Sequence, residues 1–363
     1  MSLMAFLLAA ALSAASMPVI IEFARRRRLF DKHDERKVHD GEVPRLGGVG
    51  ISFAFICSVG AFVALEYSFR SSVAHGIRVL PLVLSGVAIL MLGLIDDLRT
   101  LRARFKLVIQ AAATLLVMSA GYRFKIVLIP WGNGTFDLGV FSWPLTFIWI
   151  IGVTNAINLI DGMDGLAAGI SAIAATAFGT MMLIGGDTMG AVLCFALCGA
   201  AVGFLLYNKP PAKIFMGDSG SLFLGFCLSV LPLLGQTDHD ARIGFLSAST
   251  ILAIPIFDTL SAIWRRTRAG ISFFTPDRGH MHHRLQTLGF GPKAVLAVVY
   301  SACIILSLSA VSSVLLPSPW SFSVKVAALA ACLCGFIALN GVKIINPENG
   351  NGTDTHNPPT TRN

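Results

Sequence analysis

Residues 80–100 read LPLVLSGVAILMLGLIDDLRT, an apolar run that ends in two adjacent carboxylates, Asp96 and Asp97. A helix needs roughly 20 apolar residues to cross the hydrocarbon core of a bilayer. The stretch therefore predicts a membrane-spanning helix with paired negative charge at one end. Ionisable residues at membrane depth are rare and usually functional, so the same stretch indicates where a site is to be sought.

The composition of the whole chain agrees with this fold class. Hydrophobic residues make up 55% of the 363 residues and charged residues 13%, whereas water-soluble domains carry about 25% charged residues. The seven cysteines lie in apolar runs without a CxxC pair, which argues against a disulfide framework or a zinc site. The net charge of +8 is explained by membrane topology and anionic headgroups rather than by nucleic acid.

The apolar segments predict an all-α polytopic membrane protein with about eleven transmembrane helices. The first segment is expected to be an uncleaved span, because its positive charges, Arg25 to Arg28, follow the apolar stretch instead of preceding it. We expect residues 1–345 to form one integral membrane domain and the polar residues 346–363 to be a disordered tail. The segments are 1–22, 47–66, 79–95, 106–121, 143–160, 165–184, 188–207, 217–235, 243–264, 293–316 and 321–342.

The loop charges predict the orientation of these helices, because cytoplasmic loops are enriched in Lys and Arg. If the loop after the first segment is cytoplasmic, that side of the membrane receives most of the basic residues. This orientation places the N-terminus outside and the C-terminus inside. In the connection 122–142 we expect a short β-like hairpin around Gly132–Gly134. The opposite side keeps only Arg70, Arg78, Arg123, Lys125 and Arg242, with Lys325 near an edge.

Four polar clusters fall on the predicted cytoplasmic side. Because they are far apart in sequence and face the same water interface, they indicate one shared site at the cytoplasmic face. The clusters are the Asp96–Asp97 pair, NAINLIDGMDG at 155–165, YNKPPAKIFMGDSG at 207–220 and TPDRGHMHHRL at 275–285.

The cluster at 155–165 combines amides and acids at helical spacing. Asn155 and Asn158 are three residues apart and would share one helix face. The two asparagines could simply hydrogen-bond a neighbouring helix. For Asp161 and Asp164, which lie in a glycine-punctuated turn, a ligand or metal role is favoured.

The clusters at 207–220 and 275–285 indicate phosphate chemistry. Asp218 and Ser219 precede an apolar helix, so they could cap it, and free N–H groups at its N-terminus would suit a phosphate. The three histidines at 280–283 could bind zinc, but the remaining carboxylates and amides favour magnesium, and we interpret the histidines as phosphate donors. The inventory matches phosphoryl-group transfer, and the membrane setting indicates that one substrate is a lipid.

Seven motifs in order resemble one family, the polyprenyl-phosphate N-acetylhexosamine-1-phosphate transferases, which are related to the phospho-MurNAc-pentapeptide translocase. The PRLGG ending and the HMHHRL motif favour the sugar-1-phosphate branch over the translocase. The resemblance implies magnesium-dependent transfer of a sugar-1-phosphate from a UDP-sugar to undecaprenyl phosphate with release of UMP. The motifs are RKVHDGEVPRLGG (36–48), GLIDDLRT (93–100), ARFK (103–106), NAINLIDGMDGLAAG (155–169), YNKPPAKIFMGDSGSLFLG (207–225), PIFDT (255–259) and DRGHMHHRL (277–285).

The resemblance also implies roles for individual residues. It places magnesium, or alternatively manganese, on Asp218 and Asp97, and makes Asp96 the base, although either adjacent aspartate could take the proton. Lys106 would meet the lipid phosphate, and His282 would act with the three aspartates. Asp258 and Asn155 are left open between function and helix anchoring. The residues implied for the nucleotide and sugar are Asn158, Asp161, Asp164, Asn208, Phe215, Arg278, His280 and His283.

Several alternatives stay open at this point. The donor is expected to be UDP-N-acetylglucosamine, with UDP-GalNAc, a 6-deoxy amino sugar or phospho-MurNAc-pentapeptide as alternatives. The reaction could be one in-line displacement or pass through an aspartyl phosphate. A membrane transporter is the competing class, but it would place its polar residues near the bilayer midplane. The expected location is the bacterial plasma membrane, and a second copy of the chain is a further candidate partner.

Overall fold

The computed structural model describes residues 1–30, 43–70, 74–128, 135–234, 244–270 and 279–341. Nearly all of its regular structure is helical, as the apolar segments predict. The elements are α1 (Ser2–Arg26), α2 (Gly47–Arg70), α3 (Ala74–Leu98), α4 (Ala103–Ser119), β1 (Ile126–Leu128), β2 (Thr135–Asp137), the 3₁₀-helix η1 (Gly139–Phe141), α5 (Ser142–Ile160), α6 (Leu166–Gly185), α7 (Thr188–Asn208), α8 (Gly217–Leu234), α9 (Phe245–Ile251), α10 (Ala253–Arg268), α11 (Met281–Thr287), α12 (Pro292–Ser313) and α13 (Ser318–Gly341).

Each of the eleven predicted apolar segments coincides with a helix or a bent pair of helices. Within the described ranges, nine helices are long and apolar enough to cross a membrane, and the bent pair α9–α10 would make a tenth. The remaining segment is α4, which has 17 residues and is shorter than the roughly 20 that a full span needs. The fold class is therefore confirmed, with nine or ten clear spans where we expected about eleven.

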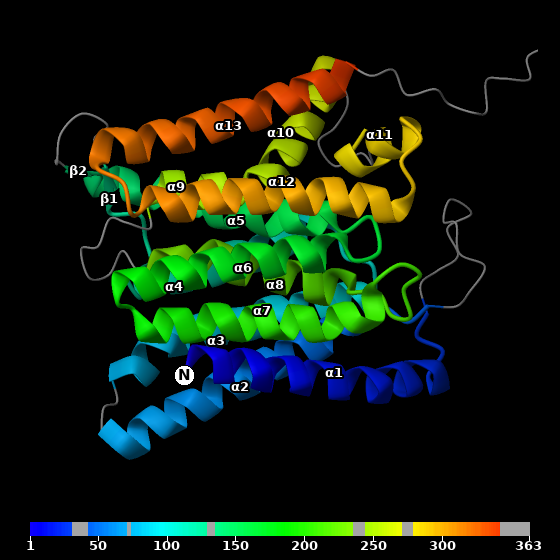
Figure 1. Ribbon diagram of the computed structural model, residues 1–363. Coiled ribbons are helices and arrows are strands. Elements are labelled where there is room, and N and C mark those ends of the chain that lie inside the picture. The colour runs from blue at the N-terminus through cyan, green and yellow to red at the C-terminus, as the bar shows by residue number, and fades with distance from the viewer. Residues whose placement is uncertain (31–42, 71–73, 129–134, 235–243, 271–278, 342–363) are drawn as a thin grey trace, which may run out of the picture.

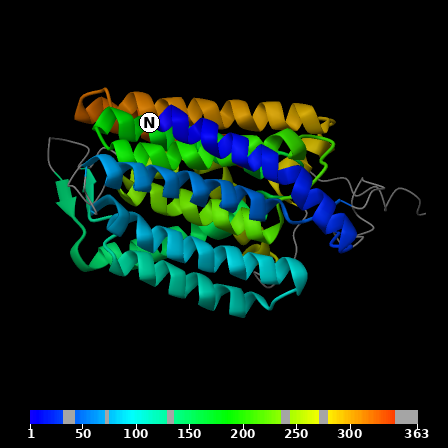
Figure 2. The ribbon, with the colours of Figure 1, turned by 90° about the horizontal axis from the view of Figure 1, so that it is seen from below.

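The long helices lie side by side along one common direction (Figures 1 and 2). β1 and β2 pair antiparallel at one end of the bundle, with Val127 opposite Phe136, which confirms the hairpin predicted for 122–142. The helix α11 lies at the other end, where α13 also finishes, whereas α1 begins at the β1–β2 end (Figure 1). The start of α1 and the end of α13 thus lie at opposite ends of the helix bundle. The predicted tail 346–363 lies outside the described residues.

Small residues allow the helices to pack closely, because in lipid no hydrophobic effect drives helices together and close backbone contact must supply the attraction. In α7, Gly199 and Gly203 are four residues apart, and a side chain at either position would collide with the α1 carbonyl oxygens of Phe6 and Ala10. The hydroxyl of Ser13 in α1 donates to the Ala200 carbonyl at 2.8 Å. The α1–α7 contact is therefore backbone against backbone.

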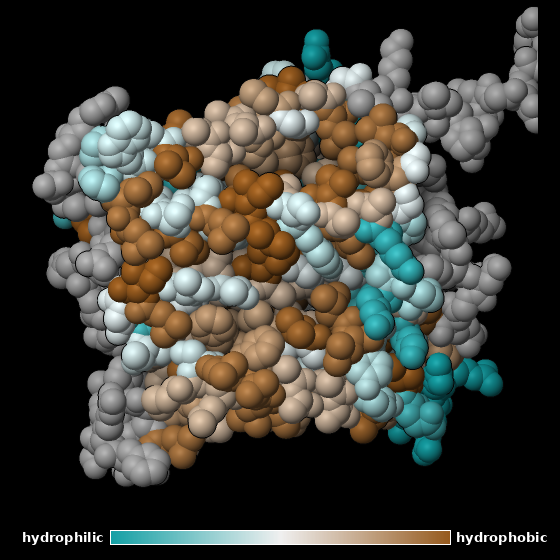
Figure 3. All heavy atoms as spheres, in the orientation of Figure 1, coloured by the Kyte–Doolittle hydropathy of each residue, from teal (hydrophilic) through white to brown (hydrophobic). Residues whose placement is uncertain are grey.

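The helix α8 is the centre of the bundle and α13 lies at its edge. In the most apolar window of α8, 94% of the residues are buried, whereas in that of α13 the share is 11%. The face shown in Figure 3 is largely apolar between its two ends, and on α12 the side chains of Ile305 and Leu308 are 65% and 62% exposed. Such a surface fits hydrocarbon, and the buried α8 is the helix on which the polar clusters meet.

The bend between α9 and α10 measures 82° and has a local cause. Pro255 lies in the first turn of α10 and has no N–H to donate to the carbonyl four residues earlier, so α9 cannot continue in register. Pro is tolerated in the first turn of a new helix, where N–H groups lack intrahelical partners. The bend directs α10 along the end of the molecule that contains α11 (Figure 1).

Candidate active site

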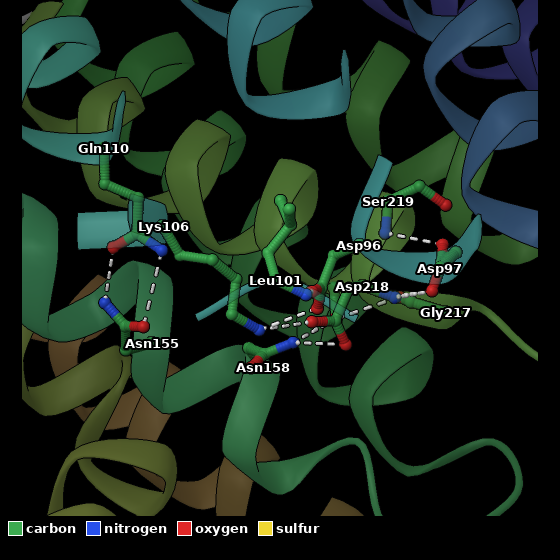
Figure 4. Close-up of polar contacts among 11 residues, drawn as sticks. Asp96, Asp97, Leu101, Lys106, Gln110, Asn155, Asn158, Gly217, Asp218 and Ser219 are labelled. Carbon is green, nitrogen blue, oxygen red and sulfur yellow. Dashed lines mark hydrogen bonds and ion pairs between the residues drawn. The ribbon is translucent and has the colours of Figure 1, made fainter. Parts of the chain in front are cut away.

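The end of α3 caps the start of α8. Asp97 accepts hydrogen bonds from the backbone N–H groups of Asp218 at 2.8 Å and Ser219 at 3.0 Å, as Figure 4 shows. Gly217 precedes them with a φ of +70°, and a Cβ there would lie 2.5 Å from an Asp97 oxygen, so glycine is required on both counts. We expected free N–H groups at this helix start to await a phosphate, and that expectation is wrong for these two, because Asp97 already accepts from both.

Lys106 joins the other two acids. Its Nζ lies 2.7 Å from Asp96 Oδ2 and 2.8 Å from Asp218 Oδ2, and the three side chains come from α3, α4 and α8 (Figure 4). The second oxygen of Asp96 accepts the Leu101 N–H at 2.6 Å, which fixes the carboxylate at the α3–α4 turn. We call Asp96, Asp97 and Asp218 the acidic cluster.

The end of α5 contributes an amide to the acidic cluster. Asn158 donates to Asp218 Oδ1 at 3.2 Å and to Ser221 Oγ at 2.8 Å. Asn155, one turn earlier, exchanges hydrogen bonds of 2.7 and 3.4 Å with Gln110 of α4 instead. The two asparagines therefore have different contacts: Asn155 hydrogen-bonds a neighbouring helix, while Asn158 contacts the acidic cluster.

The α5–α6 turn is tied to the loop that precedes α8. Asp164 Oδ2 accepts the Ala212 N–H at 2.9 Å. Asn208, which is buried, accepts the Gly165 N–H and donates to the Ile214 carbonyl, both at 2.9 Å. Asp164 and Asn208 thus shape the walls of the site, and their roles toward a nucleotide remain predictions.

The remaining predicted nucleotide residues are half-buried or lie beyond the described ranges. The backbone of Phe215 pairs with the segment before α2, accepting the Gly47 N–H at 3.0 Å and donating to the Pro44 carbonyl at 2.8 Å. Asp161 ends α5 and is half-buried. Arg278 falls outside the described residues.

Three imidazoles lie next to one another, and that of His282 packs against the α5–α6 turn. The rings of His280 and His282 are nearly parallel with centroids 6.1 Å apart, and His283 lies 4.1 Å from His282. A Cβ on Gly162 would be 2.8 Å from two ring atoms of His282, so the ring packs against the turn that follows Asn158. We call these three residues the histidine row. The four polar clusters predicted to share a site therefore do meet in space.

Burial decides the charge state of His282, the most enclosed member of the row. The side chain is 2% exposed, and this burial, followed by the neighbouring His283, lowers its pKa to about 3 against a weaker opposing effect of Asp258. His282 is therefore neutral near pH 7, and neither ring nitrogen has a hydrogen-bond partner among the described residues. A neutral imidazole offers one N–H donor and one acceptor.

Two residues that we did not single out from sequence belong to this arrangement. Ser221 accepts from Asn158, and Gln110 pairs with Asn155. Gln110 offered a signal, since it is an amide within the predicted apolar segment 106–121 and is 1% exposed. Ser221 gave none, because serine is common at the start of helices.

The acidic cluster suits a divalent cation bound together with a phosphorylated ligand. The three carboxyl groups of the cluster and the single Lys106 ammonium leave negative charge to be balanced, and magnesium usually binds one or two carboxylates plus substrate phosphates. Within the described ranges no group of three or more His, Cys, Asp or Glu side chains surrounds one metal position. The protein alone thus offers two carboxylates for a metal, Asp96 and Asp218, each of which bonds the Lys106 ammonium through its Oδ2.

The fold and the site together define a polytopic membrane protein with a cluster of charged and polar side chains at one end of its helix bundle, and comparison with known proteins shows its family. Residues 79–236, which include the acidic cluster, match the family model described as glycosyl transferase family 4. The chain is 37% identical, over 81% of its length and 80% of the relative's, to a probable undecaprenyl-phosphate N-acetylglucosaminyl 1-phosphate transferase of Bacillus subtilis.

Two further relatives carry similar names. A decaprenyl-phosphate N-acetylglucosaminephosphotransferase of Mycobacterium tuberculosis is 34% identical over 89% of the chain and 83% of the relative. The undecaprenyl-phosphate alpha-N-acetylglucosaminyl 1-phosphate transferase of Escherichia coli K12 is 31% identical over 78% and 76%. The chain belongs to glycosyl transferase family 4, in the group of polyprenyl-phosphate sugar-1-phosphate transferases.

Proposed function

We propose that this protein transfers N-acetylglucosamine-1-phosphate from UDP-N-acetylglucosamine to undecaprenyl phosphate, with release of UMP. The observation that supports it most is a chain of hydrogen bonds that joins four helices, from Asp96 through Lys106 and Asp218 to Asn158. The names of the relatives supply the donor sugar and the polyprenyl acceptor. The product would be the lipid-linked diphospho-sugar that starts a cell-envelope polysaccharide.

The proposed chemistry is a single in-line displacement. An oxygen of the lipid phosphate forms a bond to the β-phosphorus of the UDP-sugar, the bond from that phosphorus to the bridging oxygen breaks, and UMP leaves with the oxygen. Asp96 takes the proton of the lipid phosphate, and Lys106 draws that phosphate in by charge. Catalysis of this kind depends mainly on positioning and charge neutralisation.

Magnesium is proposed as the cofactor, with manganese as a substitute. When bound, it would offset negative charge on the diphosphate. Asp218 is the ligand common to the sequence motif and the geometry. One candidate for the second ligand is Asp96, which bonds the same Lys106 ammonium as Asp218. The other is Asp97, the residue implied by resemblance, which accepts one backbone N–H on each oxygen and keeps one lone pair on each.

The histidine row is proposed to bind the diphosphate or the sugar. His282 is buried against Gly162, directly after the helix whose Asn158 contacts Asp218, so a ligand between the row and the acidic cluster would touch both. Asp161 and Phe215, on the surrounding turns, are proposed for the nucleotide. We further propose that this end of the bundle faces the cytoplasm of a bacterial cell, with the N-terminus outside, since the loop charges favour that orientation.

The test is a donor panel with the purified full-length protein, undecaprenyl phosphate and magnesium. UMP release and the mass of the lipid product would be measured for UDP-GlcNAc, UDP-GalNAc, a UDP-6-deoxy amino sugar and UDP-MurNAc-pentapeptide. We expect UDP-GlcNAc to give the highest kcat/KM and the product mass of a GlcNAc diphospholipid. Flux of a sugar nucleotide across vesicles without UMP release would instead establish a transporter, and preference for another donor would correct the sugar.

A further inference from the structure

The carboxylate of Asp258 has both oxygens engaged with the segment that carries the histidine row. It lies in α10 and is 2% exposed. Its Oδ2 is 2.8 Å from His280 Nδ1, and its Oδ1 accepts the Met281 N–H at 2.8 Å. One acidic side chain thus contacts both the first imidazole of the row and the first residue of α11.

These two contacts determine the tautomer of His280. An ionised carboxylate only accepts hydrogen bonds, so Nδ1 of His280 must carry the proton that it shares with Asp258. In this tautomer the Nε2 of His280 carries no proton, so it can accept a hydrogen bond. A carboxylate that accepts a hydrogen bond from one ring nitrogen likewise sets the tautomer of histidines that bind metals.

The same helix holds this segment at a second point. Arg265, seven residues or about two turns after Asp258, lies against Gly279, where a Cβ would be 2.6 Å from the Arg265 Nε. Arg284 of α11 donates to the Gly279 carbonyl at 2.9 Å. The segment 279–281 therefore has a defined place on one face of α10, and the ring of His280 is oriented by Asp258 within it.

We propose that Asp258 is a positioning residue for the transfer reaction: it sets the Nδ1–H tautomer and the orientation of His280, and with them the alignment of the histidine row against the α5–α6 turn. This inference rests on the proposed function. Asp258 is distant in sequence from the acidic cluster, and its hydrogen bonds reach the row through His280 and the start of α11.

The contacts distinguish positioning from simple anchoring. Anchoring α11 to α10 needs only an acceptor for the Met281 N–H, which an amide oxygen supplies equally well. In Asp258→Asn that oxygen can keep the Met281 bond, while the amide NH₂ would face His280 Nδ1 as a donor. The ring must then accept at Nδ1 and carry its proton on Nε2. Asp258→Asn thus preserves the anchor and inverts the tautomer.

The kinetic test compares wild type, Asp258→Asn and Asp258→Glu as purified full-length protein in lipid nanodiscs. Loss of a partner that orients a functional histidine typically lowers activity about 10- to 100-fold. We expect Asp258→Asn to lower kcat for UMP release by that factor, with KM for UDP-GlcNAc changed by less than about threefold. Asp258→Glu, which keeps the carboxylate, should recover part of the loss.

The matched control is Thr259→Val, an isosteric change at the next residue of α10, whose buried hydroxyl has no hydrogen-bond partner among the described residues. Its kcat should stay within about twofold of wild type, as expected for a substitution that removes no interaction. A kcat for Asp258→Asn equal to that of this control would overturn the proposal.

The second readout is the tautomer itself, measured by nitrogen-15 NMR of histidine-labelled protein in the same nanodiscs, with His280→Gln to assign the signal. We expect the Nδ1–H form in wild type and the Nε2–H form in Asp258→Asn. A loss of kcat with an unchanged tautomer would reduce Asp258 to a structural anchor. If the wild-type protein released no UMP, the proposed function would fail, and the tautomer would still decide whether Asp258 orients His280.

Discussion

The acidic cluster contacts the end of α5 and the histidine row packs against the turn that follows it, but the two groups differ in how their polar atoms are satisfied. In the acidic cluster every carboxylate oxygen accepts at least one hydrogen bond or ion pair from Lys106, Asn158 or a backbone N–H. In the row, both nitrogens of buried His282 lack a partner among the described residues. An unsatisfied buried polar group costs about 1–3 kcal/mol, so the acidic cluster and the histidine row differ in their contribution to stability as well as in geometry.

This difference indicates a division of work. A cluster whose bonds are complete before any ligand arrives is preorganised, and preorganised charges need no rearrangement during reaction. A buried imidazole without partners gains its hydrogen bonds only when a ligand supplies them. We therefore expect changes in the acidic cluster to reduce catalysis most, and changes at His282 to alter stability in the opposite direction from activity.

The largest effect is expected for Asp218→Asn. Asp218 contacts Lys106 and Asn158 and is the ligand proposed for the metal, so its loss removes charge where the reaction needs it. UMP release by the purified variant should fall by roughly 10³-fold, while insertion into membranes, followed by fractionation, should be normal.

The matched control for that variant is Asp137→Asn at the other end of the bundle, in β2. Asp137 accepts the Gly139 N–H at 2.8 Å, and an asparagine oxygen can do the same, so activity should be unchanged within about twofold. Near-normal turnover by Asp218→Asn would remove the metal assignment.

The next effect is expected for Lys106→Met, which leaves Asp96 and Asp218 facing each other without their shared ammonium. We expect kcat/KM to fall about 10²-fold. Because Lys106 and Asp218 act as a unit, the double variant Lys106→Met/Asp218→Asn should lose far less than the product of the single losses. Multiplicative losses would separate the two roles.

A buried lysine elsewhere provides the control for Lys106→Met. Lys325 in α13 is 4% exposed and contacts the hydroxyls of Ser247 and Ser321 at 3.4 and 3.2 Å. Lys325→Met removes a buried ammonium whose contacts among the described residues are hydroxyl groups, and UMP release should stay within about twofold of wild type.

His282→Phe should uncouple activity from stability. The folded-state pKa of about 3 lies below the ordinary value near 6.5, so between these values the unfolded chain binds a proton that the folded chain excludes. The contribution of His282 to the free energy of unfolding is therefore largest above pH 6.5 and decreases as the pH falls, by on the order of 1–2 kcal/mol at about pH 5. Phenylalanine removes this dependence.

The measurement is the apparent melting temperature in detergent at about pH 8 and pH 5, together with UMP release. Wild type should lose more of its melting temperature on acidification than His282→Phe, which should be inactive yet no less stable. The comparison at pH 8, where the proton linkage vanishes, is the internal control. An equal pH response in both proteins would show that His282 is not the neutral, unsatisfied group described above.

Much of the fold could be predicted because hydropathy is read along the chain. The eleven apolar segments and the hairpin at 122–142 follow from local composition and turn residues. The bend after Ile251 was the exception, although Pro255 in the sequence marks it. The acids could be singled out because ionisable residues at membrane depth are rare.

The partners of those acids could not be predicted in the same way. That Asp97 caps α8 while its neighbour Asp96 bonds Lys106 depends on which helices are adjacent, and a single sequence does not state this. The same limit applies to Asp258, whose two contacts lie 22 and 23 residues further along the chain. Local pattern identified the chemical groups, and tertiary packing assigned their bonds.

The smallest effect is expected at the Gln110–Asn155 amide pair, which joins the two helices that carry Lys106 and Asn158. Gln110 is one turn after Lys106 on α4, and Asn155 is one turn before Asn158 on α5, so the pair sets how these two helices present their polar groups. Asn155→Leu leaves the buried Gln110 amide without this partner, and Gln110→Leu leaves Asn155 with its bond to the Ile151 carbonyl. Either change should destabilise by about 1–3 kcal/mol, with UMP release reduced less than about tenfold.

The double variant Gln110→Leu/Asn155→Leu should be more stable than either single variant, because replacing both partners with apolar groups leaves no orphaned amide. Melting temperatures of the four proteins give the coupling between the two residues. Thr114→Val, one turn further along α4, is the control and should match wild type, because the Thr114 hydroxyl has no hydrogen-bond partner in the part of the chain that the structure describes. Additive losses would mean that the amides act separately and that packing alone aligns Lys106 with Asn158.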